Sequence, residues 1–174
     1  MPKILVTPLS AVEETIRRDK PSHLVTLLSP EHMIATPDGI MHDCHLKLEL
    51  NDVADVWGSE WPPAAHHIES LLAFGRAWPA REPILVHCWA GVSRSMAAAY
   101  ILLCDRIGPG SEREIARALR YRAPHACPNS LMIRIADTML SRDGRMIDAV
   151  ESIGRGALVA QGERVEFPIA PSEL

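Results

Sequence analysis

The sequence lacks a hydrophobic run long enough to cross a membrane. Its longest apolar stretch, Met96–Cys104, lies between Arg94 and Asp105, far short of the roughly 20 residues that a spanning helix requires. The N-terminal segment has only a short apolar run at residues 4–6, which is not typical of a secretory signal. We therefore expect a cytoplasmic protein that makes no use of a membrane.

Paired-cysteine motifs are also missing. The four cysteines, at positions 44, 88, 104 and 127, form no CxxC pair and no regular framework, so we expect reduced thiols rather than a disulfide scaffold. The segment His42-Asp43-Cys44-His45 has metal-capable side chains. Neighbours on a strand point to opposite faces, so they would not converge on one ion. No metal or other cofactor is expected.

The charge balance excludes a further class of partner. The formal net charge is -4 over 174 residues, so nothing in it indicates nucleic-acid binding or an anionic membrane. Neither internal repeats nor low-complexity segments are present. The length fits one domain, which we place at residues 1–156. Pro168 and Pro171 argue against a helix in residues 157–174, which we expect to form an extended C-terminal tail.

Hydrophobic periodicity predicts an α/β fold. Strands are expected where apolar residues alternate or form short buried runs, and helices where they recur every three or four positions. Together they predict a central, mostly parallel sheet of about four to five strands flanked by helices. The predicted strands are 3–9, 23–28, 43–50 and 84–87. The predicted helices are 11–19, one that begins at about 64 and includes Trp78, 95–107, one that begins at 111, 129–140 and 145–153.

The segment His87-Cys88-Trp89-Ala90-Gly91-Val92-Ser93-Arg94-Ser95 lies between a buried strand and a buried helix. A loop that precedes a helix N-terminus directs free backbone N–H groups and a positive dipole at one point, which makes an anion site. Gly91 lets the loop turn, and Arg94 can hold two phosphate oxygens with its planar guanidinium. Such a field favours a nucleophilic thiolate at Cys88.

The pattern His-Cys-x-x-Gly-x-x-Arg-Ser resembles the phosphate-binding loop of the protein tyrosine phosphatase superfamily. The chain is most similar to its compact, dual-specificity-like branch, and in particular to small bacterial members, over about residues 43–140. The resemblance implies a dual-specificity phosphatase-like fold, with a Cys88 nucleophile and phosphate held by Arg94. It also implies that Ser95 assists departure of the sulfur and that His87 orients the loop. The remaining phosphate-binding positions would be Trp89, Ala90, Gly91, Val92 and Ser93.

The same resemblance implies a general acid on a loop upstream of the nucleophile. Asp52 directly follows the strand at 43–50, and Asp55 lies deeper in the loop. We favour Asp52 because an acid just beyond a strand is held more firmly, but Asp55 stays an alternative. Asn129, in a Pro-Asn pair similar to that of related enzymes, could support the phosphate loop or simply cap a helix.

Three further side chains leave alternatives open. Cys44 could reach Cys88 and protect it as a disulfide, as in similar enzymes, if their strands are adjacent; we do not favour this, because disulfide geometry is strict. Trp57 and Trp61 could wall the substrate pocket, but we expect them to pack and anchor their loop.

We predict a metal-independent phosphoric monoester hydrolase that forms a cysteinyl-phosphate intermediate. Its partner would be a phosphorylated protein, with phosphotyrosine the first candidate and dual specificity a second, or a small phosphomonoester. The absence of lysine from the loop argues against polyanionic phosphoinositides. The alternatives are a phosphate-recognition module without turnover and a rhodanese-like sulfurtransferase. The oligomeric state is not predicted.

Overall fold

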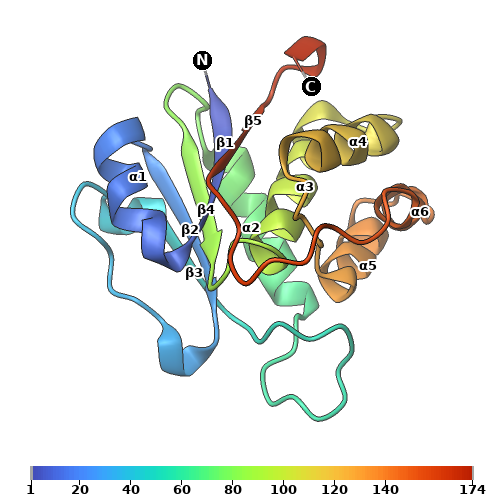
Figure 1. Ribbon diagram of the computed structural model, residues 1–174, viewed down its shortest axis with the longest axis horizontal. Coiled ribbons are helices and arrows are strands. Elements are labelled where there is room, and N and C mark those ends of the chain that lie inside the picture. The colour runs from blue at the N-terminus through green and yellow to red at the C-terminus, as the bar shows by residue number, and fades with distance from the viewer. Residues whose placement is uncertain (1, 174) are drawn as a thin grey trace.

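In the computed structural model, which describes residues 2–173, a five-stranded sheet lies between a single helix and a layer of helices (Figure 1). Strands and helices alternate in the first half of the chain, and helices dominate the second half. The strands are β1 (Lys3–Pro8), β2 (His23–Leu28), β3 (His45–Glu49), β4 (Ile84–Cys88) and β5 (Val165–Pro168). The helices are α1 (Val12–Asp19), α2 (Ala65–Ala77), α3 (Arg94–Ile107), α4 (Glu112–Arg122), α5 (Ser130–Met139) and α6 (Arg145–Ser152).

The strand order is β3-β2-β4-β1-β5, and all neighbouring pairs are parallel except β1 with β5. The predicted fold class is therefore confirmed. Because β1, β2, β3 and β4 run the same way, their C-terminal ends meet at one edge of the sheet. That edge is where ligands bind in open α/β sheets.

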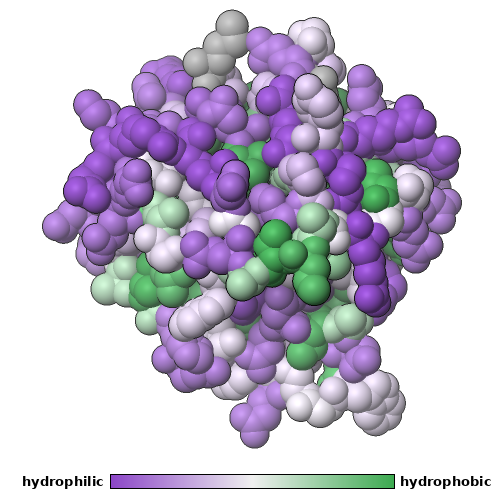
Figure 2. All heavy atoms as spheres, in the orientation of Figure 1, coloured by the Kyte–Doolittle hydropathy of each residue, from purple (hydrophilic) through white to green (hydrophobic). Residues whose placement is uncertain are grey.

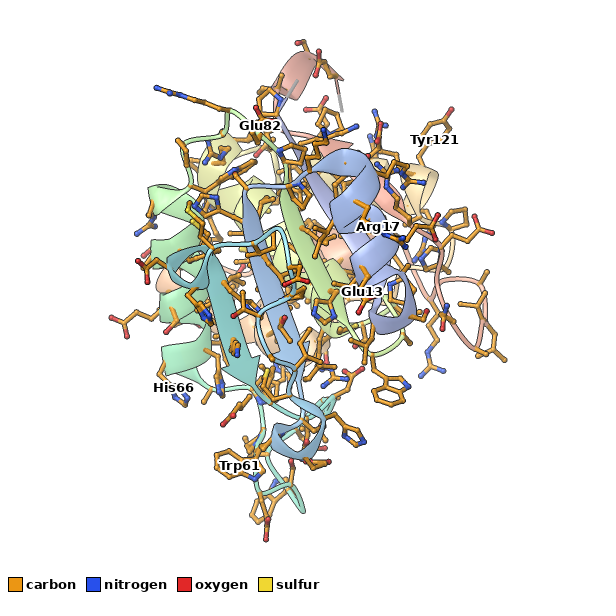
Figure 3. The ribbon with its side chains drawn as sticks, turned by 90° about the vertical axis from the view of Figure 1, so that its left-hand side faces the viewer. Glu13, Arg17, Trp61, His66, Glu82 and Tyr121 are labelled. Atoms are coloured by element: carbon orange, nitrogen blue, oxygen red, sulfur yellow. The ribbon has the colours of Figure 1, made fainter. Side chains whose placement is uncertain are left out.

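The two faces of the sheet carry cores of very different size. α1 alone covers one face, and Figure 3 shows it lying across the strands, with Glu13 and Arg17 exposed on it. On the other face the buried side chains of α2–α6 form a much larger cluster. The smaller core under α1 consists of Leu5, Val12, Ile16, Leu24, Ile40 and Leu85.

Alternation along β4 assigns its last two residues to different faces. Ile84, Val86 and Cys88 belong to the large core, whereas Leu85 belongs to the small one. Since successive strand residues point to opposite faces, His87 lies on the α1 side and Cys88 on the side of α3. The strand thus separates the buried imidazole from the sulfur at its end.

Most predicted ends lie within one or two residues of the observed ends, and two differences affect the sheet. Residues 42–44 form a 3-10 turn, so β3 begins only at His45. The segment after residue 157 contributes β5, whose pairing with β1 is reinforced by an ion pair of 2.7 Å between Lys3 and Glu166. It was expected to be extended, but its pairing with the first strand could not be read from a local pattern.

The surface shown in Figure 2 is largely hydrophilic, with apolar atoms in small separate patches. Within residues 2–173, no helix is long and apolar enough to cross a membrane.

Candidate active site

Cys88 ends β4, and its sulfur is surrounded by hydrogen-bond donors. The residue is 1% exposed. The Ser95 hydroxyl lies 3.1 Å from Sγ, and the backbone N–H of Gly91 donates to Sγ at 3.3 Å. The Gly91 N–H and the Ser95 hydroxyl can both donate to a thiolate at this position, one from the loop and one from the first turn of α3.

Residues 89–93, the loop that follows Cys88, are held in place by hydrogen bonds to four of their backbone carbonyl groups. A trans peptide is planar, so the N–H that follows each held carbonyl points the opposite way. The bond from the Gly91 N–H to Cys88 shows that this direction leads towards the sulfur. The carbonyls of Trp89, Ala90, Val92 and Ser93 accept from the backbone N–H groups of Leu9, Gly162, Cys127 and Ala97 at 3.1, 2.8, 2.9 and 2.9 Å.

Gly91 is required by this path of the loop. Its φ is +71°, and a Cβ there would lie 2.8 Å from the backbone nitrogen of Pro8 at the end of β1. Only glycine combines that dihedral angle with such a close approach of two backbones at low cost. The sheet and the loop therefore touch directly at this residue.

Arg94 is the first residue of α3, and its long side chain is 6% exposed. Nη1 donates to the carbonyl of Leu50 at 2.9 Å, which ties the guanidinium to the chain just beyond β3. Nε has no hydrogen-bond partner in the described part of the chain. It lies 3.9 Å from the Asp52 carboxylate. A buried guanidinium with one anchored and one unpaired donor can bind an anionic oxygen without moving.

Asp52 and Asp55 occupy different environments. Oδ1 of Asp52 accepts from the Ser93 hydroxyl at 2.6 Å and from the Asn129 amide at 2.9 Å, so this carboxylate contacts the phosphate loop. The carboxylate of Asp55 instead accepts from the backbone of Trp57 at 3.0 Å in an exposed turn. Of the two acids, only Asp52 makes these contacts with the loop that follows Cys88.

Asn129 caps a helix, and its side-chain amide contacts the loop after β3 instead of the phosphate loop. Its side-chain oxygen accepts from the Met132 N–H at 3.0 Å and caps α5. Its amide donates to Asp52 and, at 3.0 Å, to the carbonyl of Val53. One side chain therefore joins the start of α5 to residues 51–63, the acid loop.

His87 is fully buried beneath the loop. Nε2 lies 2.7 Å from the hydroxyl of Thr26, and Nδ1 lies 3.4 Å from the carbonyl of Cys88. Burial lowers the pKa of His87 to about 4, so the ring is neutral at physiological pH and holds the loop by hydrogen bonds. The orienting role expected of His87 stays a prediction, and these contacts are the geometry that it requires.

The tryptophans correct one expectation. Trp57 and Trp61 were expected to pack, but they are 86% and 47% exposed. Their loop projects from the lower end of the molecule, where Figure 3 shows Trp61 at the surface. Trp89 is 54% exposed and contacts His32 edge to face, with the ring centroids 4.9 Å apart. These three tryptophans are therefore not part of the core.

A disulfide between Cys44 and Cys88 is excluded by topology. β2 lies between their strands, and the register aligns His45 with Leu85, at the opposite end of β4 from Cys88. Two strand spacings of about 4.8 Å each already exceed the reach of a disulfide.

Two contributions to the site were missed by the sequence analysis. Gly162, in the segment between α6 and β5, donates to the phosphate loop, and a Cβ there would lie 2.5 Å from the His125 ring. Leu50 supplies a backbone carbonyl to Arg94. A carbonyl has no residue-type signature, and a lone glycine in a tail gives no indication of what it contacts.

An open groove of about 570 Å³ adjoins the acid and the loop. Its lining residues include Asp52, Ser93, Cys127, Asn129, Val150 and Arg155.

By sequence, no protein-family model and no curated protein matches this chain. Solved structures do match its fold. The crystal structure of DUSP15 aligns with a TM-score of 0.64 at 17% identity, over 90% of this chain and 96% of that one. The human tyrosine phosphatase-like serine/threonine/tyrosine-interacting protein aligns with a TM-score of 0.63 at 14% identity, over 79% and 91%. PTPMT1 in complex with PI(5)P gives 0.59 at 15% identity, over 84% and 94%.

These comparisons define the class of structure: the chain has the fold of the dual-specificity phosphatases and of PTPMT1. At identities below 20% they identify the architecture alone, so the chemistry has to be argued from the site.

Proposed function

We propose that this protein is a cysteine-dependent phosphatase that hydrolyses phosphomonoesters through a cysteinyl-phosphate intermediate. The observation that carries the proposal is the position of Cys88. Its sulfur lies in a loop with four carbonyls that accept backbone hydrogen bonds from other segments or from α3, with the N–H of Gly91 directed at the sulfur and the unpaired Nε of Arg94 in the same loop. Backbone amides and a guanidinium are the donors that stabilise a phosphoryl group as it is transferred.

In the first step the Cys88 sulfur attacks phosphorus. A sulfur–phosphorus bond forms and the ester oxygen–phosphorus bond breaks. The leaving oxygen takes a proton from Asp52, which the contacts with Ser93 and Asn129 hold beside the loop. Arg94 and the loop amides bind the equatorial oxygens throughout.

In the second step a water molecule attacks the cysteinyl-phosphate. Asp52, now a carboxylate, accepts the proton of the water, and the sulfur leaves as a thiolate. The Ser95 hydroxyl, 3.1 Å from the sulfur, stabilises that thiolate by donating a hydrogen bond. The products are inorganic phosphate and the free alcohol or phenol, and no metal ion takes part in this scheme.

We propose a phosphorylated protein as the substrate, with phosphotyrosine the first candidate. The exposed Trp89 and the groove beside Asp52 leave room for a peptide around the phosphorylated side chain. A mechanism that depends on a free thiol fits the reducing cytoplasm, where we place the protein. Cys44, Cys88, Cys104 and Cys127 are all unpaired.

Phosphate release from an aryl phosphate in the presence of EDTA tests the proposal. We expect turnover, and an acid quench should trap phosphate on the peptide that contains Cys88. The same protein should be assayed with phosphotyrosine and phosphoserine peptides and with thiosulfate. A folded protein that releases no phosphate from any ester would contradict the proposal. Phosphate binding alone would indicate a recognition module, and thiosulfate turnover a sulfurtransferase.

A further inference from the structure

A continuous chain of hydrogen bonds leads from the phosphate loop to the surface on the α1 side of the sheet. It begins at the Cys88 carbonyl and passes through His87 to Thr26 in β2. Nε2 of His45 in β3 lies 2.8 Å from the same Thr26 hydroxyl. Nδ1 of His45 lies 3.0 Å from the Thr36 hydroxyl, which also lies 3.3 Å from Nδ1 of the exposed His42.

The direction of every bond in this chain follows from its first member. A carbonyl only accepts, so Nδ1 of His87 carries the proton, and Nε2 must accept from the Thr26 hydroxyl. That hydroxyl has then used its one proton, so its oxygen accepts from Nε2–H of His45. By the same logic Thr36 donates to Nδ1 of His45 and accepts from His42. The tautomers are assigned from this network. In all five side chains the protons can point along the chain towards the Cys88 carbonyl, so no donor meets a donor.

Both histidines inside the chain are held neutral. Burial is the main cause that lowers the pKa of His87 to about 4, with smaller effects from His45 and Arg94. Burial also lowers the pKa of His45 to about 4, and Lys47 and His42 are the charged or titratable groups that add to this effect. The chain therefore keeps its polarity through the physiological pH range.

We propose that Thr26 and His45 are positioning residues of the active site, which fix the tautomer and ring plane of His87 and so support the ionised form of Cys88. The Nδ1–H of His87 polarises the Cys88 carbonyl. The N–H of that same peptide, the first in the phosphate loop, becomes a stronger donor, because linked hydrogen bonds reinforce one another. This inference deepens the proposed function and rests on it for its relevance to turnover.

The sheet itself offers a matched control. Thr26 in β2 and Thr7 in β1 both pair with His87 in the register of β4, one on each side. Both are fully buried. The hydroxyl of Thr26 bonds to His87, whereas that of Thr7 has no partner in the part of the chain that is described. Thr26→Val and Thr7→Val are thus the same isosteric change at equivalent places, and only the first removes the bond.

The test is the pH dependence of iodoacetamide alkylation, followed by mass spectrometry on the Cys88 peptide so that the other thiols do not interfere. We expect Thr26→Val to raise the midpoint of Cys88 alkylation by up to about one pH unit, because the lost hydrogen bond acts on the sulfur only through His87 and the Cys88 peptide. Thr7→Val and the conservative Thr26→Ser should keep the native midpoint. In turnover, the rising limb of kcat/KM against pH, which reports the free enzyme, should move with the alkylation midpoint.

Equal midpoints for Thr26→Val and Thr7→Val would overturn the inference, whatever their thermal stabilities. If Thr26→Val does not fold, His45→Ala replaces it: we expect a smaller rise in the same direction, and no rise overturns the inference. Alkylation needs no substrate, so a native protein without phosphatase activity would defeat the proposed function and still leave this test valid.

Discussion

The phosphate loop and the acid loop of this protein are held in opposite ways. Residues 89–94 are fixed from three directions, by the start of the chain at Leu9, by Gly162 in the C-terminal segment and by Cys127 before α5. The acid loop, residues 51–63, contacts the rest of the domain mainly near its start, where Asp52 and Val53 meet Asn129. Its tip, with Trp57, is exposed. The half of the site that we propose to bind phosphate is held in place before any ligand binds, and the half that we propose to supply the proton is anchored at one end.

Removal of the nucleophile is expected to have the largest effect on activity. Cys88→Ser keeps the shape of the loop but replaces the sulfur by a hydroxyl that is not ionised at neutral pH, so turnover of an aryl phosphate should fall by at least about 10³-fold. Cys44→Ser is the control, because Cys44 lies two strands away. Equal loss in both variants would mean that the assay reports folding instead of chemistry.

Substitution of the two aspartates tests which residue of the acid loop supplies the proton. With an alkyl phosphate, Asp52→Asn should lower kcat by about 10²-fold, the range of general acid catalysis. The loss should be smaller with an aryl phosphate, whose leaving group needs less help from a proton. Asp55→Asn should change kcat by less than about twofold, since its carboxylate only closes a turn. The reverse order would assign the acid to Asp55, in the exposed part of the loop.

A glycine in each loop tests how tightly that loop is held. Gly91 and Gly58 have similar dihedral angles, with φ of +71° and +74°, but a Cβ at Gly91 would meet the backbone of Pro8, whereas nothing lies within 4 Å of Gly58. Gly91→Ala should therefore reduce stability by about 2 kcal/mol or more and impair turnover. Gly58→Ala should cost about 1 kcal/mol or less. Thermal denaturation of both variants measures the contrast, and equal costs would contradict it.

The buried histidines beneath the phosphate loop predict a gradual loss of stability in acid. In the unfolded chain a histidine has a pKa of about 6.5, whereas burial lowers the pKa of His87 and of His45 to about 4. Between these values the unfolded chain binds protons that the folded chain does not. The free energy of unfolding should therefore fall as pH decreases from about 6.5 to 4, and His87 alone should contribute a slope of up to about 1.4 kcal/mol per pH unit.

Urea denaturation at pH 7 and pH 5 measures this loss, and His45→Gln should reduce its slope. Equal free energies of unfolding at the two pH values would contradict the prediction, because they would mean that the buried rings take up protons as readily as in the unfolded chain. Above pH 7 these two groups should contribute no further change.

Much of the fold could be read from local patterns, because local physics decides it. The run Ile84–His87 is apolar enough to be buried on both faces, and β4 forms there. Residues 23–28 form β2 as predicted. β3 and α3 differ from their predicted ranges by one or two residues at an end. The pairing of β5 with β1 was not predicted, since it joins the two ends of the chain and neither segment indicates its partner.

The sequence by itself determined the phosphate loop, because its glycine turn, cysteine and arginine lie within a few residues between one strand and one helix, where backbone geometry places them. Only the tertiary structure brought Asp52, but not Asp55, against that loop, separated Cys44 from Cys88, and connected His87 to His45 through Thr26. Each of these relations joins residues that are far apart in the chain. They depend on strand order and register, which the packing of the whole domain decides.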